Sequence, residues 1–272
     1  EAPNVYVDTV TMDQLRHAII TGGKLSEQRL AWEMREKMKN LLAYWWARIV
    51  DDVIFKKLSG TTFTDSASTP QTFGEAATAN TNNLYGGGKT ASNQLTTSDT
   101  FDPVLLRRAK EAAMVGVGTY AAAGTLNSSI WRIRPMIVGG KPYYGCVLHP
   151  YQVTDLQGTQ AWEQAHREIQ GLREHNDNPI FTGALGLWNG CIMYSHDKVV
   201  TGSDAGPGAD VPYADALFFG YQAGIWAEAQ QAPDWIEKSF DFDDQYAVAT
   251  GMIFGFDKTT FNSKDFAVIK IR

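Results

Sequence analysis

Residues 146–152 read Cys-Val-Leu-His-Pro-Tyr-Gln and mark the end of a strand. The run 143–148 is apolar and strand-like, and Pro150 has no backbone N–H with which to continue a sheet. Upstream, residues 130–138 and the Gly139-Gly140 turn predict the other half of a β-hairpin. The middle of the chain is therefore expected to be β-structure.

Helices and strands are mixed irregularly on the C-terminal side of this strand. An amphipathic pattern predicts a helix over residues 161–174. Apolar runs bounded by turn residues then predict strands at residues 190–195, 216–220, 224–228, 245–254 and 266–271. No repeating βαβ rhythm connects them, so the sequence favours the α+β class.

Two helices are predicted on the N-terminal side. Apolar residues recur every three or four positions between residues 30 and 53, with Ser26 placed to cap the helix and Gly60 placed to stop it. Asp102-Pro103, a capping carboxylate followed by proline, predicts the start of a second helix that runs towards Val117.

Two segments lack a core-forming pattern of their own. Residues 1–24 are expected to form an arm with at most one short helix, at residues 12–20. Residues 59–100 are dense in Thr, Ser, Asn, Ala and Gly, and loops longer than about 12–15 residues are uncommon in compact domains. This segment is either a surface insertion without fixed structure or a loop that becomes ordered on a neighbouring molecule, with Phe73 and Tyr85 as its anchors.

Large aromatic side chains supply the candidate interface residues. Trp45 and Trp46 widen the apolar surface of the long helix beyond one narrow stripe. The helix is either an ordinary core helix or one whose aromatic face is partly buried against another subunit, because tryptophan is enriched where partners meet. The candidate subunit-interface residues are Trp45, Trp46, Phe73, Leu84 and Tyr85.

Composition narrows the class of partner. The 272-residue chain is 44% hydrophobic and 20% charged, which is typical of a folded globular protein. Its formal net charge of −6 disfavours a surface that binds nucleic acid by neutralising phosphates. No run of about 18 apolar residues occurs, so no membrane-spanning helix is expected.

No linear motif predicts catalysis, a cofactor or a metal site. Residues 86–90 end like a phosphate-binding loop, but Asn83 stands where that motif needs glycine. The five histidines lack metal-ligand spacing, and the acidic cluster Asp241, Asp243 and Asp244 favours a solvated turn. The sequence therefore predicts a protein that is not an enzyme, although catalytic sites can also form from scattered residues.

Seven segments of the second half of the chain carry a family resemblance through their order. They are residues 146–152, 155–157, 178–186, 189–195, 216–220, 244–248 and 266–271. In this order they resemble the major capsid proteins of the "N-four"-type family of tailed bacteriophages, which have the Hong Kong 97-like capsid fold. The resemblance extends from around Ser26 to the last residue of the sequence.

The resemblance implies a layout in five parts, in which the peripheral domain contains a long spine helix at residues 102–117. The parts are an N-terminal arm (1–25), a long amphipathic helix (26–58), an extended loop that overlaps a neighbour (59–100), a peripheral domain (101–149 and 232–272) and an axial domain (150–231).

The function that the resemblance implies is self-assembly into the icosahedral shell that encloses phage DNA. The partners would be other copies of the chain in hexamers and pentamers, with decoration, scaffold and portal proteins as further candidates. The double-stranded DNA would be enclosed without sequence-specific binding, and no membrane would be contacted. The protein would be made in the cytoplasm of the host bacterium and located in the virion capsid.

Two other classes of function stay open. A ligand- or carbohydrate-binding module is suggested by eight Trp and eleven Tyr, which could form a stacking surface. A carboxylate-based hydrolase would use Asp155, Glu163 and Asp177, and it would need a concave pocket that contains acids with perturbed pKa values.

Overall fold

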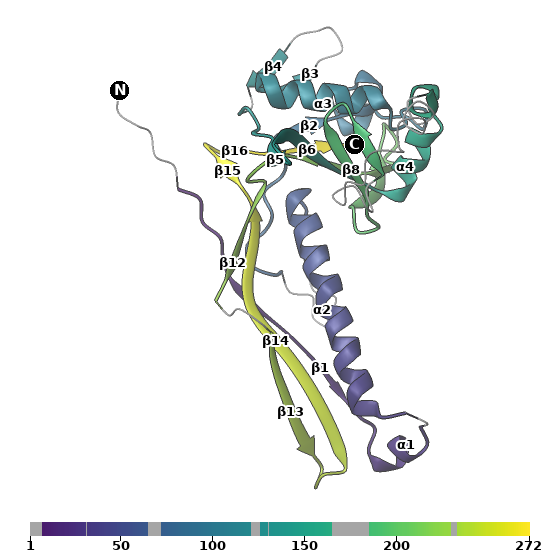
Figure 1. The fold of residues 1–272 in the computed structure, drawn as a ribbon, viewed down its shortest axis with the longest axis vertical. Coiled ribbons are helices and arrows are strands. Elements are labelled where there is room, and N and C mark those ends of the chain that lie inside the picture. The colour runs from purple at the N-terminus through teal and green to yellow at the C-terminus, as the bar shows by residue number, and fades with distance from the viewer. Residues whose placement is uncertain are drawn as a thin grey trace.

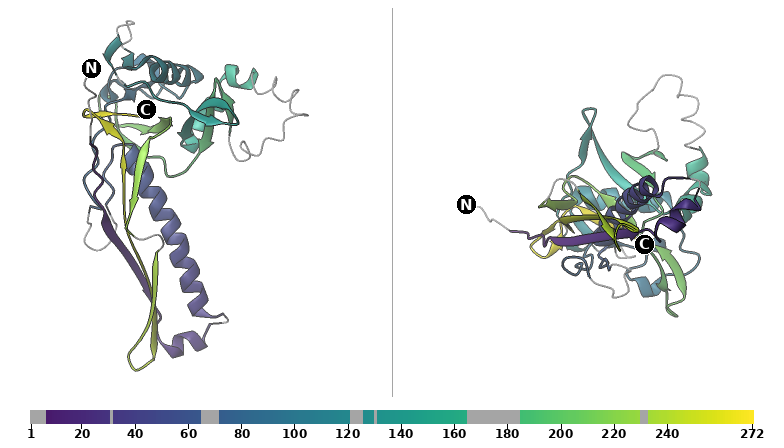
Figure 2. Two further views of the ribbon diagram at one scale, coloured as in Figure 1. Left: turned by 60° about the vertical axis from the view of Figure 1, so that its left-hand side comes forward. Right: turned by 90° about the horizontal axis from the view of Figure 1, so that it is seen from below.

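The chain forms an elongated body and a compact body that lie one below the other (Figure 1). The computed structural model describes residues 7–30, 32–64, 72–120, 126–129, 131–164, 185–229 and 233–272. A turned view shows the same division, with a long helix and several strands projecting from the compact body (Figure 2). The mixture of helices and strands confirms the predicted α+β class.

A four-stranded antiparallel sheet and one long helix form the elongated body. Its central strand is β14 (Gln245–Lys258); β1 (Asp13–Ile20) pairs along one edge, and β13 (Asp234–Phe240) and β12 (Gly224–Glu228) share the other. Helix α2 (Met34–Leu58) lies along the sheet (Figure 1). Its apolar side chains at intervals of three or four residues point at the sheet and are buried; they include Met38, Leu42, Ile49 and Val53.

Strand β1 corrects the prediction for the N-terminal arm. The sequence predicts at most a short helix over residues 12–20, but β1 pairs with β14 along its whole length, from Asp13 opposite Phe254 to Ile20 opposite Ala247. This partner lies near the other end of the chain, so no local pattern could reveal it.

The long helix is confirmed over most of its predicted length, but it begins later than predicted. A separate short helix, α1 (Lys24–Gln28), covers the predicted start at Ser26. Helix α2 begins only after Glu33, whose backbone is extended.

The compact body is built on a seven-stranded mixed sheet. The strand order is β2-β17-β11-β6-β8-β7, and β5 pairs with β6. The bounds are β2 (Asn83–Leu84), β17 (Val268–Ile271), β11 (Ala216–Phe219), β6 (Lys141–Leu148), β8 (Cys191–Ser195), β7 (Gly186–Trp188) and β5 (Met136–Val138). Strands β5 and β6 confirm the hairpin that is predicted around Gly139-Gly140.

Helix α3 (Pro103–Val115) covers this sheet and begins where the sequence predicts. Val104 N donates a hydrogen bond of 3.0 Å to the Asp102 carboxylate, and Pro103 occupies the first helical position. Leu106 of α3 is fully buried in the same apolar cluster as Phe218 of β11. The cap therefore fixes where the helix starts, and burial of its apolar side chains holds it on the sheet.

Helix α4 (Pro150–Gln157) is not predicted by the sequence analysis, which treats Pro150 only as the end of a strand. Tyr151 N donates to His149 Nδ1 at 3.3 Å, and His149 N donates to Gln152 Oε1 at 3.1 Å. This capping box lets the proline that ends β6 also begin a helix. Residues up to 164 of the helix predicted at 161–174 are helical, and the rest of it lies outside the described residues.

The remaining elements of both bodies are short strands and two short 3-10 helices, η1 and η2. They are η1 (Gly86–Gly88), η2 (Ser92–Gln94), β3 (Val117–Tyr120), β4 (Leu126–Ser129), β9 (Thr201–Ala205), β10 (Val211–Ala214), β15 (Thr260–Phe261) and β16 (Lys264–Asp265).

Residues 72–100, the described part of the segment rich in Thr, Ser, Asn, Ala and Gly, fold back onto their own chain. This finding corrects the expectation of a loop that becomes ordered on a neighbour. Leu84 lies in β2, pairs in parallel with β17 and is 6% exposed. Phe73 is 3% exposed, and its ring lies 4.7 Å from that of Phe254. The side chain of Asn82 donates to the carbonyl of Val268 at 3.2 Å. Long-range pairing therefore supplies the order that the local composition does not indicate.

The two bodies cut across the expected domain boundaries. Strands β6 and β17 belong to the expected peripheral domain, yet they share a sheet with β8 and β11 of the expected axial domain. The bodies meet at the C-terminal half of α2, where Lys198 Nζ lies 2.9 Å from Asp52 Oδ1. The sheet of the compact body therefore combines strands that the expected layout assigns to two domains.

Candidate subunit interface

The five predicted interface residues do not form one surface. Trp46 and Phe73 lie in one apolar cluster of the elongated body, with Trp45 at its edge, whereas Leu84 lies in the core of the compact body. Trp46, Phe73 and Leu84 are buried, so they have almost no surface left for a neighbour. Trp45 and Tyr85 are partly exposed, and their interface role stays a prediction.

Other apolar side chains are exposed, and they gather on the sheet of the elongated body. Val248 of β14 is fully buried beneath α2 beside Met38. Successive residues of a strand point to opposite faces, so Ala247 and Ala249 face away from α2. Cross-strand pairing places Ile20 next to Ala247 and Ile236 next to Ala249 on that outer face.

We call Ile20, Ile236 and Phe240 with the alanines between them the outer sheet face. Ile20, Ile236 and Phe240 are each about half exposed. Phe240 pairs with Gln245 and has the same parity along β13 as Ile236, so both side chains lie on one face. The same pairing places Lys238 opposite Ala247 and Arg16 opposite Gly251 on this face, so its exposed apolar side chains lie among charged ones. An antiparallel sheet can leave one face to water, and large apolar side chains that are half exposed on such a face mark a candidate contact with a partner.

The turn between β13 and β14 presents a further aromatic side chain. Phe242 in this turn is fully exposed. The turn itself lies at the end of the molecule farthest from the compact body (Figure 1). Asp241, Phe242 and Asp243 have φ angles of 50°, 53° and 68°, a left-handed backbone that is uncommon outside glycine. The predicted solvated acidic turn is therefore confirmed as a turn, but it also exposes an apolar residue.

Helix α2 also has an exposed stripe on the side away from the sheet. Tyr44 and Leu41 are both more than half exposed, and three positions separate them, so they are neighbours on the helix surface. This stripe explains why the sequence of α2 is apolar on more than one side: one side packs on the sheet and the other is open.

An ionic cluster holds the distal half of the sheet to α2. Glu237 of β13 accepts hydrogen bonds from Arg35 and from the Tyr246 hydroxyl, and it forms an ion pair with Lys39. The hydrogen bonds from Lys39 and Tyr246, followed by that from Arg35, lower the pKa of Glu237 from 4.5 to about 2. The carboxylate therefore stays ionised over most of the pH range in which proteins are handled.

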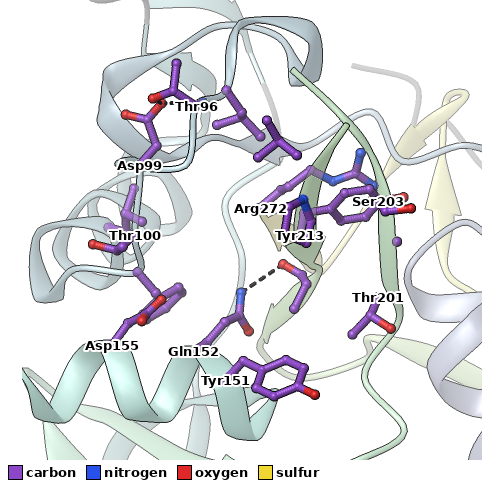
Figure 3. Close-up of a pocket in the computed structure, with 17 residues that line it drawn as sticks. Thr96, Asp99, Thr100, Tyr151, Gln152, Asp155, Thr201, Ser203, Tyr213 and Arg272 are labelled. Atoms are coloured by element: carbon purple, nitrogen blue, oxygen red, sulfur yellow. Dashed lines mark hydrogen bonds between the residues drawn. The ribbon is translucent and has the colours of Figure 1, made fainter. Parts of the chain in front are cut away.

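A cavity of about 520 Å³ opens in the compact body between residues 95–105, α4 and the β9–β10 hairpin (Figure 3). Arg272 stacks over the ring of Tyr213 at 3.5 Å. Its Nε and Nη2 donate to the two oxygens of the buried Asp215 carboxylate at 2.6 and 2.8 Å. The guanidinium is therefore already paired and is not free to recognise an anionic ligand.

Among the described residues, Asp155 is the one acid of the hydrolase alternative that lines this cavity. Asp99 lines it as well, and its carboxylate accepts a hydrogen bond of 2.9 Å from Thr96 N. Glu163 is not one of the lining residues, and Asp177 lies outside the described residues. In the described part of the chain no three His, Cys, Asp or Glu side chains form a group that could hold a metal.

Two further structural findings concern the expected lack of membrane contact and the two cysteines of the chain. Within the described residues, no helix is long and apolar enough to cross a bilayer. Cys146 and Cys191 are unpaired and buried on adjacent strands, and burial raises the pKa of both thiols.

Comparison with known proteins gives a consistent family. The family model described as phage capsid protein matches residues 1–272. The chain is 25% identical over 289 residues to the major capsid protein of Pseudomonas phage KPP25, covering all of this chain and 76% of that protein. It is similar to a chain of the capsid of Ralstonia phage GP4, with 32% identity and a TM-score of 0.79 over 96% of this chain and 73% of that one.

A more distant capsid shares the fold. The capsid chain of cyanophage Pam1 is 19% identical, with a TM-score of 0.69 over the whole of this chain and 79% of that one. The exposed apolar side chains of the outer sheet face agree with these matches. The chain belongs to the phage capsid protein family, and its function is that of the major capsid protein of a tailed phage.

Proposed function

We propose that copies of this chain tile an icosahedral shell of hexamers and pentamers, and that the outer sheet face is the main surface by which they bind one another. The observation that carries this proposal is the position of Ile20, Ile236 and Phe240, which are exposed on the sheet face that α2 does not cover. Heterologous contacts between different surfaces of identical copies build closed shells. Burial of apolar area at such contacts contributes roughly 25 cal/mol per Å².

The layout of the shell subunit follows from its two bodies. The elongated body would be the peripheral domain, with α2 as the long spine helix in place of residues 102–117. Two features support this assignment: α2 has 25 residues and runs along a sheet, whereas α3 has 13 and belongs to the compact body. The compact body, which holds α4 and the β9–β10 hairpin, would be the axial domain.

The remaining proposed partners are the enclosed DNA and other virion proteins, and the observations that support them are less specific. The formal net charge of −6 suits a container that does not adhere to the double-stranded DNA it encloses. Decoration, scaffold and portal proteins are further proposed partners, and synthesis in the host cytoplasm would precede assembly into the virion. The proposed role is structural and includes no enzymatic step.

Size-exclusion chromatography followed by negative-stain microscopy of the purified full-length protein tests the proposal. Closed particles of uniform size are the expected result. A stable monomer that saturably binds a sugar would favour the carbohydrate-binding module. A monomer that loses a hydrolytic activity when Asp155 is replaced by Asn would favour the hydrolase, and either outcome would contradict the shell proposal.

A further inference from the structure

Three buried polar side chains meet where the elongated and compact bodies join. Lys258 at the end of β14, Asn80 and Asp265 in β16 are 2%, 8% and 1% exposed. Lys258 Nζ lies 2.6 Å from Asn80 Oδ1 and 2.6 Å from Asp265 Oδ1. A primary amine is thus held against a side-chain carboxamide, with a carboxylate beside it.

The surrounding backbone fixes the three groups in this arrangement. Asp265 Oδ2 accepts a hydrogen bond of 2.7 Å from Thr81 N, and Asn80 Nδ2 donates one of 3.0 Å to the carbonyl of Leu58. Gly60 has φ +73°, and a Cβ there would lie 2.6 Å from Asn80 Oδ1, so a side chain at position 60 would displace the carboxamide.

Apolar side chains also lie beside the site. Leu58, Leu217 and Val268 form a buried apolar cluster beside it, with Phe256 packed against them. An ammonium and a carboxylate lose most of their hydration in such a place, and they contact each other and the carboxamide instead of water. Lysine amines that are desolvated in this way act as nucleophiles toward carbonyl carbons once a neighbouring base removes a proton.

We propose that Lys258 and Asn80 join in an isopeptide bond within one chain, with Asp265 as the group that carries the proton. The Asp265 carboxylate takes one proton from the Lys258 ammonium, and the resulting amine attacks Cγ of Asn80 and forms the new C–N bond. The bond between Cγ and Nδ2 of Asn80 breaks, and the departing nitrogen receives one proton from Asp265 and one from the Lys258 nitrogen, so that it leaves as ammonium and Asp265 is a carboxylate again. The step consumes no oxidant, nucleotide or metal, because an amide replaces an amide.

The arrangement supplies what this reaction needs. The amine and the carboxamide are held in contact before any reaction, which removes the entropic cost of bringing them together. The neighbouring carboxylate acts first as a base and then as an acid, the role for which enzymes position Asp and Glu. The product ties residue 80 to β14 covalently, and it therefore closes the chain from residue 80 to residue 258 into a ring.

A second buried lysine provides an internal control. Lys57 is as deeply buried as Lys258, but its Nζ donates to the backbone carbonyl of Glu75 and lies 3.9 Å from Asp257 Oδ2. Neither of these two partners of Lys57 is a side-chain carboxamide. Lys57 is therefore expected to keep a free amine in the same molecules in which Lys258 has none.

Mass spectrometry of the purified full-length protein under denaturing conditions tests the bond and does not depend on shell assembly. The expected intact mass is lower than the mass calculated from the sequence by one ammonia, and digestion yields a branched peptide that joins Lys258 to Asn80. The Lys258→Arg variant, which keeps the positive charge, should have its full calculated mass. Denaturing electrophoresis should show single chains, because the bond does not link copies.

An intact mass equal to the calculated one would overturn the proposal, since Lys258, Asn80 and Asp265 would then form an ordinary ion pair and hydrogen bond. A mass deficit located at any other residue, including Lys57, would overturn it as well.

Discussion

Trp46 Nε1 donates a hydrogen bond of 2.8 Å to Thr250 Oγ1, and both residues are buried between α2 and β14. The bond joins residues that are 204 positions apart and lies inside the apolar cluster that contains Phe254. It therefore fixes the helix against the sheet at the middle of the elongated body.

Replacing Thr250 by Val should lower the free energy of unfolding of the isolated subunit. Valine keeps the shape of threonine but leaves the indole N–H buried without a partner, which costs about 1–3 kcal/mol. Urea unfolding followed by tryptophan fluorescence measures the change. Thr154→Val is the matched control, because the Thr154 hydroxyl bonds the Pro150 carbonyl on an exposed side of α4 and should cost little. Equal effects of both substitutions would contradict the role of the buried bond.

Replacing Phe73 by Ala should destabilise the isolated subunit strongly, because the ring is buried against Phe254 of the same chain. A buried Phe→Ala substitution costs about 3–5 kcal/mol. Phe242→Ala, at a fully exposed position, should leave the unfolding midpoint unchanged. If Phe73→Ala altered only assembly and left the subunit as stable as before, residue 73 would bind a neighbour. The packing of residues 72–100 against their own chain would then be contradicted.

The Glu237 cluster predicts a loss of stability in acid. The pKa of Glu237 in the folded chain is about 2, below its ordinary value of 4.5, so the folded state favours the ionised form. The contribution is complete above pH 4.5 and is lost as the pH falls from there through about 2. The difference in urea midpoint between the wild type and Glu237→Gln should therefore shrink between pH 6 and pH 2.5. A difference that stays constant over this range would contradict the assignment.

Replacing Ile236 and Phe240 together by Ser should prevent shell formation without unfolding the subunit. Both side chains lie on the outer sheet face, where their apolar area is open in a single chain. Loss of that area weakens a contact between copies, and small losses are multiplied over many contacts in a shell. Analytical ultracentrifugation measures assembly, and circular dichroism measures folding. Tyr151→Ser is the control, since Tyr151 is even more exposed but lies on α4 at the rim of the cavity. Normal particles from the double variant would show that the outer sheet face is not part of the interface between copies.

Local sequence signals predicted the parts of the fold that depend on neighbouring residues. The Asp102-Pro103 start of α3, most of α2 and the Gly139-Gly140 hairpin all follow from contacts within a few positions. Helix α4 also has a local signal, the His149 and Gln152 capping box. The helix was not predicted because Pro150 was interpreted only as the end of a strand.

Pairing between distant segments could not be predicted in the same way. Strand β1 and strand β2 have little pattern of their own, and each is fixed by a strand near the C-terminal end, β14 and β17. The interface residues show the same limit, because an aromatic side chain signals burial but not the chain against which it is buried. Phe73 is inside its own chain, whereas Phe240 and Phe242, which the sequence did not single out, are exposed.

Electron cryomicroscopy of shells assembled from the full-length protein tests the central claim most directly. The account predicts closed particles in which Ile20, Ile236 and Phe240 of each copy are covered by a neighbouring copy. Particles in which this face is open to solvent, or a preparation that contains only monomers, would contradict it.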